Sequence, residues 1–343
     1  MYRGAIVGLG NIGLNGHLKA YLDPDIMRHA VIVAGCDLAE KNLEKFRKIL
    51  PGGRTYTDIK EMLAKEKLDF IDICTPPMSH FDIIMQGAEK KINIICEKPV
   101  DINLEALFQI KEKIVKNHLV FLPGHQYRYS PLWQKTVSII NKKLIGRPFL
   151  MQFFVYRTEA NKGNDAWNPM WRSEIENSGG GIIVDHGSHL FYLVSSILGE
   201  PRYITARTER LYHFQYTVED TAWLSIKHEN GMSQFALTWA GRERENIFRI
   251  FGTDGDILIK EDEIILNTFG KKEYIKAGEG FSGNSNHSDW YAGLFNEFFG
   301  RLGKNNFSPD GIDEAIVNAM CISAAYKSSE MNKTVALEFS ETV

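Results

Sequence analysis

A glycine-rich hexapeptide at 8–13, Gly-Leu-Gly-Asn-Ile-Gly, separates a short apolar run at 4–7 from a segment with helical periodicity at 12–21. In such a turn the first glycine allows a tight reversal, the second lets a ligand approach the backbone, and the third lets the helix pack against the strand. The N–H groups at the start of the helix then favour an anion. This arrangement predicts a parallel α/β sheet whose first turn binds phosphate.

Short apolar runs alternate with helical patterns from residue 2 to about 122. The expected strands cover 4–7, 31–36, 69–74, 93–96 and 119–122. The expected helices cover 12–21, 39–49, 59–65, 80–90 and 104–117. Continuous apolar character is typical of strands that are buried on both faces. The alternation therefore predicts a doubly wound Rossmann domain over residues 1–122 that binds a dinucleotide.

The second expected strand ends at Asp37, about as far beyond the glycine turn as the dinucleotide-binding pattern requires. A carboxylate there accepts hydrogen bonds from the ribose hydroxyls of the adenosine half. Because it would repel a 2′-phosphate and no arginine follows immediately, the sequence favours NAD over NADP as cofactor. The predicted cofactor contacts are Gly8, Gly10, Asn11, Ile12, Gly13, Asp37, Thr75, Pro76, His80, Glu97 and Lys98.

Beyond about residue 123 the pattern changes to alternation with a period of two, which is typical of strands with one buried face. Such segments cover 149–157, 203–209, 221–228, 232–239, 246–252, 256–260 and 263–268. Asn230-Gly231 and Asp254-Gly255 are hairpin signals, because these residue types tolerate positive φ. Helices are expected at 131–142, 181–198, 288–302 and 312–329. Residues 123–343 are therefore predicted to form an α+β domain with an antiparallel sheet.

Two further features carry candidate catalytic groups. Lys98 follows the fourth expected strand, so it would project from the carboxyl edge of the sheet, where open α/β sheets bind ligands. Asp185 and His189 are four residues apart on the expected helix at 181–198, which places them on one face. There an imidazole can take a proton from a hydroxyl while a carboxylate orients the ring. A solvated loop lysine and a capping pair are the alternatives, and His186, about 100° away around the helix, is predicted to be structural.

Composition excludes several classes of protein. The 343 residues carry 40 basic and 43 acidic side chains, a formal net charge of −3, so no bulk positive charge draws the chain to nucleic acid or an anionic membrane. The four cysteines form no CxxC pair, which argues for reduced thiols and against a metal site. No apolar run approaches the roughly 18 to 20 residues of a membrane span, and the N-terminus lacks signal-peptide features. These observations predict a cytoplasmic protein without nucleic-acid or membrane partners.

Six segments together resemble the Gfo/Idh/MocA family, named after glucose-fructose oxidoreductase, inositol dehydrogenase and a rhizopine catabolism protein. They are GLGNIG at 8–13, CTPPMSH at 74–80, CEKP at 96–99, HQYRYSP at 125–131, SGGGIIVDHGSH at 178–189 and EDTAWLSIKHENG at 219–231. The resemblance implies an N-terminal NAD-binding Rossmann domain, a C-terminal domain with a large, mostly antiparallel sheet, and an active site between them. It also implies a homo-oligomer, a dimer or tetramer, that assembles through the far face of the C-terminal sheet.

By the same resemblance, Lys98 contacts the reacting hydroxyl and the nicotinamide region, and Asp185 and His189 form the acid–base pair. The predicted substrate contacts are Lys98, His125, Tyr127, Arg128, Trp171, Arg172, Asp185 and His189. An aromatic ring beside a guanidinium, as at 171–172, suits a polyhydroxylated ring. A structural ion pair for Arg128 and core packing for Trp171 are the alternatives.

The predicted function is that of an NAD(P)-dependent oxidoreductase that transfers a hydride between nicotinamide and a secondary hydroxyl of a sugar, cyclitol or related polyol. His189 would take the hydroxyl proton, Asp185 would hold His189, and Lys98 would stabilise the developing negative charge. One alternative is a redox-neutral sugar-modifying enzyme that retains and recycles its NAD. Another is a ligand-sensing regulator without catalysis, whose expected sequence sign is the loss of Lys98 or of the Asp185 and His189 pair.

Overall fold

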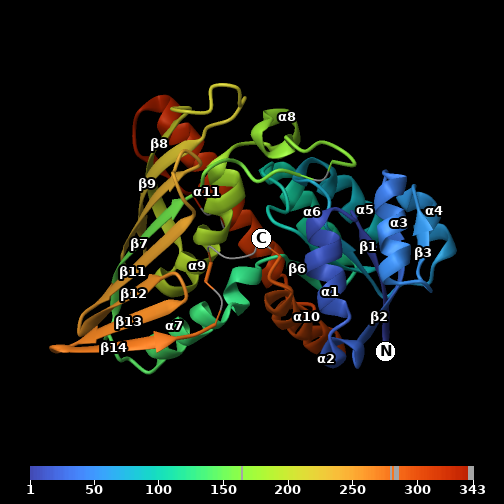
Figure 1. Cartoon of the computed structure of the whole chain (residues 1–343), viewed down its shortest axis with the longest axis horizontal. Helices are drawn as coiled ribbons and strands as arrows, with labels where there is room; N and C mark the ends of the chain where they lie inside the picture. Colours follow the sequence, from blue (N-terminus) through green and yellow to red (C-terminus); the bar gives the residue numbers. More distant parts are fainter. Residues whose placement is uncertain (164, 279, 282–285, 339–343) are drawn as a thin grey trace.

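The computed structural model describes residues 1–163, 165–278, 280–281 and 286–338 (Figure 1). Figure 1 shows two bodies side by side, a parallel sheet wrapped by helices and a large, steeply inclined sheet with helices on its inner face. The long red helix α11, Asp310–Met331, lies between them. The chain therefore has the α/β and α+β parts that the sequence predicts.

The first sheet, within the described residues, is six-stranded and parallel, in the order β3-β2-β1-β4-β5-β6. Its strands are β1 Tyr2–Val7, β2 Ala30–Cys36, β3 Arg54–Tyr56, β4 Phe70–Ile73, β5 Asn93–Cys96 and β6 Phe121–Pro123. The strand order reverses between β1 and β4, so the loops after β1, β4 and β5 meet at one carboxyl edge. The prediction missed β3, which has only three residues and no apolar run.

Helices cover both faces of this sheet (Figure 1). They are η1 Gly13–Leu18, α1 Lys19–Tyr21, α2 Pro24–Met27, α3 Glu40–Ile49, α4 Ile59–Lys65, η2 Pro77–Ser79, α5 His80–Glu89 and α6 Leu104–Lys116. Polar side chains cap their starts: Asp58 accepts from the Lys60 N–H of α4, and Asn103 accepts from two N–H groups of α6. The helix expected at 12–21 differs from the prediction, because it begins with the π turn η1.

The second sheet, in the part of the chain that is described, is nine-stranded, in the order β14-β13-β12-β11-β7-β10-β9-β8-β15. Its strands are β7 Pro148–Tyr156, β8 Pro201–Glu209, β9 Thr221–His228, β10 Met232–Thr238, β11 Glu245–Gly252, β12 Gly255–Lys260, β13 Glu263–Thr268, β14 Lys271–Lys276 and β15 Val335–Ala336. Neighbouring strands are antiparallel except β7 and β10, which run parallel. Asn230-Gly231 joins β9 to β10, and Asp254 lies before Gly255, the first residue of β12, so both hairpins form as predicted. The positive φ expected at these residues is wrong, because none of the four has it. The prediction missed β14 and β15.

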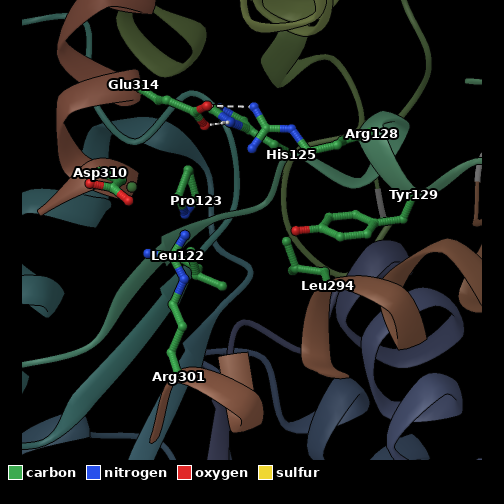
Figure 2. Close-up of a pocket in the computed structure, with 10 residues that line it drawn as sticks. Leu122, Pro123, His125, Arg128, Tyr129, Leu294, Arg301, Asp310 and Glu314 are labelled. Carbon is green, nitrogen blue, oxygen red and sulfur yellow. Dashed lines mark hydrogen bonds and ion pairs between the residues drawn. The ribbon is translucent and has the colours of Figure 1, made fainter. Parts of the chain in front are cut away.

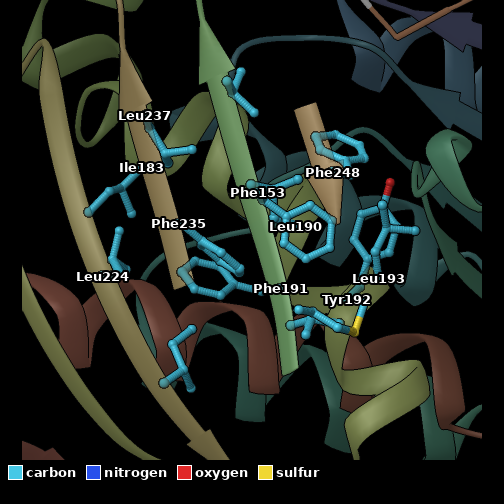
Figure 3. Packing of buried hydrophobic residues seen from close by; sticks show 14 of the residues in the cluster. Phe153, Ile183, Leu190, Phe191, Tyr192, Leu193, Leu224, Phe235, Leu237 and Phe248 are labelled. Carbon is cyan, nitrogen blue, oxygen red and sulfur yellow. The ribbon is translucent and has the colours of Figure 1, made fainter. Parts of the chain in front are cut away.

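The inner face of the second sheet carries the larger core. Phe153 of β7 lies between Phe235 of β10 and Phe248 of β11, with ring centroids 5.4 and 4.7 Å away. Figure 3 shows these rings packed against Phe191 and its neighbours on α9, Ser188–Leu198. Other helices of this domain are η3 Gln126–Tyr129, α7 Pro131–Asn141, η4 Trp171–Ser173, α8 Ile175–Ser178 and η5 Ile183–Gly187. The period-two pattern thus placed the buried side chains on the face that carries the helices.

The two C-terminal helices join the cores of both sheets. The aromatic side chains of α10, Ser288–Gly303, pack beneath β1 and β4, where Phe298 and Phe299 contact the Phe70 ring. One end of α11 packs with the first sheet through Ile312 and Ile316, and its other end packs with the second sheet through Ile322. The division at residue 122 stays a prediction, since these helices pack on both sides of it.

One helical stretch in the described part of the chain, Ile175–Leu198, is long and apolar enough to cross a membrane. Because 78% of its apolar window is buried inside the protein, it serves as a core helix. All four cysteines are buried free thiols, as the sequence predicts.

Candidate active site

Two motifs that stand 87 residues apart meet at the carboxyl edge of the first sheet. Lys98 follows β5, and its Nζ donates to the main-chain O of Asp185 at 2.9 Å and lies 3.4 Å from Oδ1 of the same residue. Both side chains are largely buried, with exposed fractions of 11% for Lys98 and 18% for Asp185. A lysine held in this way is directed at Asp185 rather than into solvent, so the alternative of a solvated loop lysine is wrong.

The Asp185 carboxylate gathers three basic groups. Besides Lys98, Arg172 Nε lies 3.6 Å from Oδ1, and His186 Nδ1 lies 3.2 Å from Oδ2. Burial alone would raise the pKa of Asp185, but His186, Lys98 and Arg172 together hold that pKa well below its usual range. Asp185 is therefore an ionised carboxylate that anchors Lys98.

His189 has different partners from those predicted. Its Nδ1 lies 3.2 Å from the hydroxyl of Tyr192, one turn further along α9, and its ring stacks on Tyr127 with centroids 4.0 Å apart. Among the residues that the structure describes, no hydrogen bond joins Asp185 to His189. The π turn η5 lies between normal helical turns and changes the register there, so Asp185 reaches its neighbour His186 instead. This corrects the expected pairing of Asp185 with His189, whereas the buried position of His186 beside Asp185 is compatible with the structural role expected for it.

The hydroxyl of Tyr192 determines which ring nitrogen of His189 can exchange a proton with a ligand. It accepts a hydrogen bond from the main-chain N–H of Tyr127 at 3.2 Å, and it keeps one hydrogen to donate and one further lone pair. It can donate to Nδ1 when His189 carries its hydrogen on Nε2, and it can accept from Nδ1 when Nε2 is bare. In either case Nε2 is the nitrogen left to exchange a proton. Burial lowers the pKa of His189 well below its usual value, and the charges of Lys98 and His186 lower it further, so the ring is neutral near pH 7.

Replacing Tyr192 with phenylalanine removes this hydroxyl and keeps the ring. We expect kcat/KM to fall about 3- to 10-fold, the equivalent of one hydrogen bond, and the acidic limb of the pH profile to shift because His189 Nδ1 loses its partner. The measurement is kcat/KM from pH 5 to 9. An unchanged profile in the variant would show that Tyr192 does not act on His189.

A cavity of about 150 Å³ is lined by His125, Arg128 and Glu314 (Figure 2). His125, whose ring stacks on Tyr192 with centroids 3.9 Å apart, places Nδ1 3.1 Å from Glu314 of α11. Arg128 pairs with the other oxygen of Glu314 at 2.5 Å, and Figure 2 shows both contacts converging on one carboxylate. Burial would raise the pKa of Glu314, but His125 and Arg128 lower it to about 2. His125 and Arg128, the predicted substrate contacts, both contact Glu314, which no sequence motif marks. For Arg128 this is the ion pair that the sequence left as the alternative.

Arg172 contacts Asp185, while Trp171 lies against Arg172 and Tyr127 stacks on His189. The Arg172 guanidinium lies over the Trp171 ring at 4.2 Å and donates to the main-chain O of Asn161 at 3.3 Å. Trp171 is half-buried and belongs to the loop that leads to the helix of Asp185. The structure therefore brings the predicted aromatic and guanidinium together beside the ion pair of Lys98 and Asp185.

The glycine turn has the shape that a dinucleotide requires. Gly8 has φ +92°, and a Cβ there would lie 2.7 Å from the backbone of Cys74. A Cβ at Gly13 would lie 2.1 Å from the O of Gly8, whereas a Cβ at Gly10 would meet nothing within 4 Å. The first and third glycines are thus needed for close packing, and the second leaves an open approach to the backbone, which fits a bound pyrophosphate.

Charge at this turn also suits the cofactor. A cleft of about 560 Å³ adjoins the turn and is lined by Gly10, Asn11, Leu14, Asn15, Lys45, Lys48, Ile49, Lys162, Gly163 and Asp165. Asn11 and Ile12 precede the helix η1, and the side-chain amide of Asn11 donates to Asn286 Oδ1 at 3.0 Å. Three lysines beside a helix N-terminus favour the two negative charges of a pyrophosphate.

Asp37 lies at the end of β2 and is tied to the turn. Its Oδ2 accepts from the Leu9 N–H at 2.7 Å and from Asn42 at 3.2 Å, and its Oδ1 accepts from the Ala39 N–H at 2.8 Å. A carboxylate has about four acceptor positions, so Oδ1 retains one for a ribose hydroxyl. The carboxylate is held in place before the cofactor arrives.

Asp37→Ser is therefore expected to weaken NAD binding about 10- to 100-fold, the value of a hydrogen bond to a charged group. The preference for NAD over NADP should shrink at the same time, because the charge that repels a 2′-phosphate is gone. Dissociation constants for both cofactors, measured by fluorescence titration, test this. Asp23→Ser, at the start of α2 and remote from the turn, is the matched control. Tighter binding of NADP than of NAD by the unmodified protein would contradict the role of Asp37.

Two predicted cofactor contacts belong to the interior instead. His80 is fully buried, with Nδ1 3.0 Å from the O of Pro99 and Nε2 2.8 Å from the O of Thr75. Glu97 accepts from the Tyr291 hydroxyl at 2.6 Å and from the Lys98 N–H at 3.1 Å. Buried polar groups need such partners, so both residues brace the loops that present Thr75 and Lys98. Thr75 and Pro76 are half-buried and follow β4, with Thr75 beside Gly8.

His17 of η1 lies in the same interior network. Its Nδ1 lies 2.7 Å from Asp72 and its Nε2 lies 3.0 Å from Glu97. Burial would lower the pKa of His17, but Asp72 and Cys74 raise it well above its usual value, so the ring is an imidazolium between two carboxylates. Ligand atoms of His17, Asp72 and Cys74 lie within 4.8 Å of one another, yet both ring nitrogens are engaged by carboxylates. The cluster is explained by hydrogen bonding.

Comparison with known proteins agrees with this geometry. Residues 2–125 match the oxidoreductase family with an NAD-binding Rossmann fold, and residues 133–258 match the GFO/IDH/MocA C-terminal domain. D-apiose dehydrogenase of Paraburkholderia graminis is 25% identical over 267 residues, which are 76% of this chain and 68% of that protein. Myo-inositol 2-dehydrogenase of Thermotoga maritima is 23% identical over 195 residues, 57% of this chain and 54% of that protein.

Among solved structures, an oxidoreductase from Agrobacterium radiobacter in complex with NAD⁺, L-tartaric acid and magnesium has a TM-score of 0.86. It is 22% identical, and the match covers 98% of each chain. The cofactor of this protein is NAD, as the glycine turn and Asp37 predict. The chain belongs to the GFO/IDH/MocA family of NAD-binding oxidoreductases.

Proposed function

We propose that the protein is an NAD-dependent dehydrogenase that oxidises a secondary hydroxyl of a sugar, cyclitol or related polyol. The observation that carries the proposal is the meeting of Lys98, Asp185 and His189 at the carboxyl edge of the first sheet. A hydrogen-bond donor and a neutral imidazole in one partly buried site are the groups that alcohol oxidation requires.

The three residues have separate tasks in this proposal. Bound NAD supplies the hydride acceptor. Lys98 Nζ donates a hydrogen bond to the substrate oxygen and stabilises the negative charge that develops there, and Asp185 fixes the direction of Nζ. His189 Nε2 takes the hydroxyl proton while Tyr192 accepts from Nδ1, and in the reverse direction Nε2 returns it.

A panel of sugars, cyclitols and sugar acids with NAD, followed by the absorbance of NADH, tests this function. We expect NADH to accumulate in proportion to the substrate consumed. Conversion of substrate without NADH would instead identify a redox-neutral enzyme that recycles its cofactor. Binding of NAD with no conversion of any compound would favour a regulator and contradict the proposal.

We also propose that the protein forms a homo-oligomer through the outer face of its second sheet. Strand register places Trp223, Ala236, Phe154 and Ile247 in one row across β9, β10, β7 and β11. Their neighbours along each strand are buried in the core, so this row faces outward, and Trp223 is 49% exposed. An apolar row on an open sheet is typical of a surface that associates. The cytoplasmic location remains a prediction.

Phe154→Lys places a charge in the middle of this row and is expected to convert the oligomer to monomers at micromolar concentration. Light scattering coupled to size-exclusion chromatography measures the mass. Gln109→Lys, on α6 of the first domain, adds the same charge away from the row. A monomeric unmodified protein would contradict the proposal.

A further inference from the structure

Basic side chains outnumber acidic ones around the proposed reacting centre. Lys98 and Arg172 both direct nitrogen atoms at Asp185 Oδ1, at 3.4 and 3.6 Å. One carboxylate thus faces two permanent cations. The whole chain has a formal net charge of −3, so this excess of positive charge is local to the site.

Asn161 extends the basic group towards the second sheet. Arg172 Nη1 donates to its main-chain O at 3.3 Å, and Arg244 Nη1 donates to its side-chain Oδ1 at 3.1 Å. Lys98, Asp185, Arg172, Asn161 and Arg244 therefore form one continuous chain of contacts. Arg172 and Arg244 thus share Asn161 as a hydrogen-bond acceptor, and Asn161 carries no charge.

A further arginine is buried next to this chain of contacts. Arg157, at the end of β7, is only 1% exposed, and its guanidinium donates to two main-chain oxygens, those of Tyr156 and Glu245, and to Asn246 Oδ1. In the described part of the protein no carboxylate lies within ion-pair distance of it, and its Nε has no hydrogen-bond partner. Burying a cation without an anion is costly. Burial lowers the pKa of Arg157, and Asp185 and Tyr127 lie near enough to affect that pKa.

Arg172 has the geometry to receive an anion. Trp171 covers one face of its guanidinium, Nε faces Asp185, and one hydrogen of Nη1 is used by Asn161. Nη2 makes no hydrogen bond to any described residue, so its two hydrogens and the second hydrogen of Nη1 are left to form an edge that receives an anion. The two parallel N–H groups of such an edge match the two oxygens of a carboxylate.

We propose that the substrate is a carboxylate-bearing polyol, a sugar acid, and that Arg172 binds its carboxylate. The inference rests on the proposed dehydrogenase function and narrows its substrate class. The negative charge of the substrate compensates the surplus of Lys98, Arg172 and Arg157 over Asp185. The carboxylate held by Arg172 then sets which hydroxyl of the polyol reaches Lys98 and His189.

Matched substrate pairs test this specificity. With saturating NAD, kcat/KM is measured for D-glucuronate against D-glucose and for D-galacturonate against D-galactose. We expect the acid to exceed its neutral parent about 10- to 100-fold, the value of one charge-assisted bond. Arg172→Gln should reduce this ratio at least about 10-fold, because the ratio cancels any general effect on Asp185. Arg28→Gln, exposed on the first domain, should leave the ratio unchanged. Equal or faster turnover of the neutral parents would overturn the proposal.

Calorimetric titration of the NAD-loaded protein with the same two acids separates this proposal from the dehydrogenase function. Saturable binding that Arg172→Gln abolishes, without NADH production, would support the carboxylate site and show that neither acid is the substrate of the dehydrogenase. Turnover of neutral sugars with no binding of either acid would support the dehydrogenase and contradict the carboxylate site. Failure of both acids to bind would overturn the carboxylate site whatever the turnover.

Discussion

Replacing Lys98 with methionine is expected to lower kcat/KM by about 10²- to 10³-fold, the usual effect of removing a donor from a developing oxyanion. Methionine keeps the length and apolar stem of lysine, so the contacts around the loop after β5 persist. The loss should fall on kcat, because Nζ contributes most when negative charge appears on the substrate oxygen. Steady-state assays of NADH formation measure it.

NAD binding by the Lys98 variant should change little, since the glycine turn and Asp37 hold the adenosine half. Lys116→Met, exposed on α6, serves as the control for surface charge. Full activity of the Lys98 variant on a substrate that the unmodified protein oxidises would remove Lys98 from the mechanism.

Replacing His189 with asparagine removes the proton acceptor and should lower kcat/KM by about 10²- to 10⁴-fold, the range for a lost general base. His118→Asn changes the same residue type at an exposed position with positive φ, which asparagine tolerates, and it should have no effect. If KM alone rises, His189 binds substrate without exchanging the proton.

The pH profile of the unmodified protein gives a second measure of His189. Because burial and Lys98 hold its pKa well below the usual 6.5, the ring stays neutral as the pH falls from 8 to 6.5. Oxidation should therefore be constant over that range and decline only at lower pH, when the imidazole becomes charged. A midpoint at or above pH 6.5 would show that the burial of His189 is relieved when substrate and NAD are bound.

Local sequence was sufficient to predict most of the fold. The glycine turn, the apolar runs and the hairpin residues depend on neighbours within a few positions, and they led to both sheets. The three-residue strand β3 was missed because Arg54–Tyr56 has no apolar run, and its pairing with β2 decides its conformation. The π turns η1 and η5 were missed because the periodicity of apolar residues along a helix does not reveal a single inserted residue.

The site was predicted less completely, for a physical reason. Residue type showed that Lys98, Asp185 and His189 could act together, but the partner of each depends on distant packing. Tyr192 reaches Nδ1 of His189, and Glu314 reaches Arg128 from a helix 186 residues later in the chain. As a residue type, His80 could contact a cofactor, but the main-chain oxygens of Pro99 and Thr75 bind its ring and give it a structural role. Only these carbonyl groups, which the sequence does not reveal, distinguish the structural role from cofactor binding.

The packing of α10 and α11 has a consequence for biosynthesis. The strands of the NAD-binding domain are translated before α10 and α11, yet Phe298 and Phe299 of α10 and Ile312 and Ile316 of α11 fill its core. A nascent chain must therefore hold an unfinished apolar surface until the last helices emerge from the ribosome. Because the contacts of α10 and α11 with the first sheet join residues far apart in the sequence, they slow the folding of this domain. The first domain in sequence is the last to be completed, and a chain that lost its C-terminal helices would be exposed to aggregation before it could bind its cofactor.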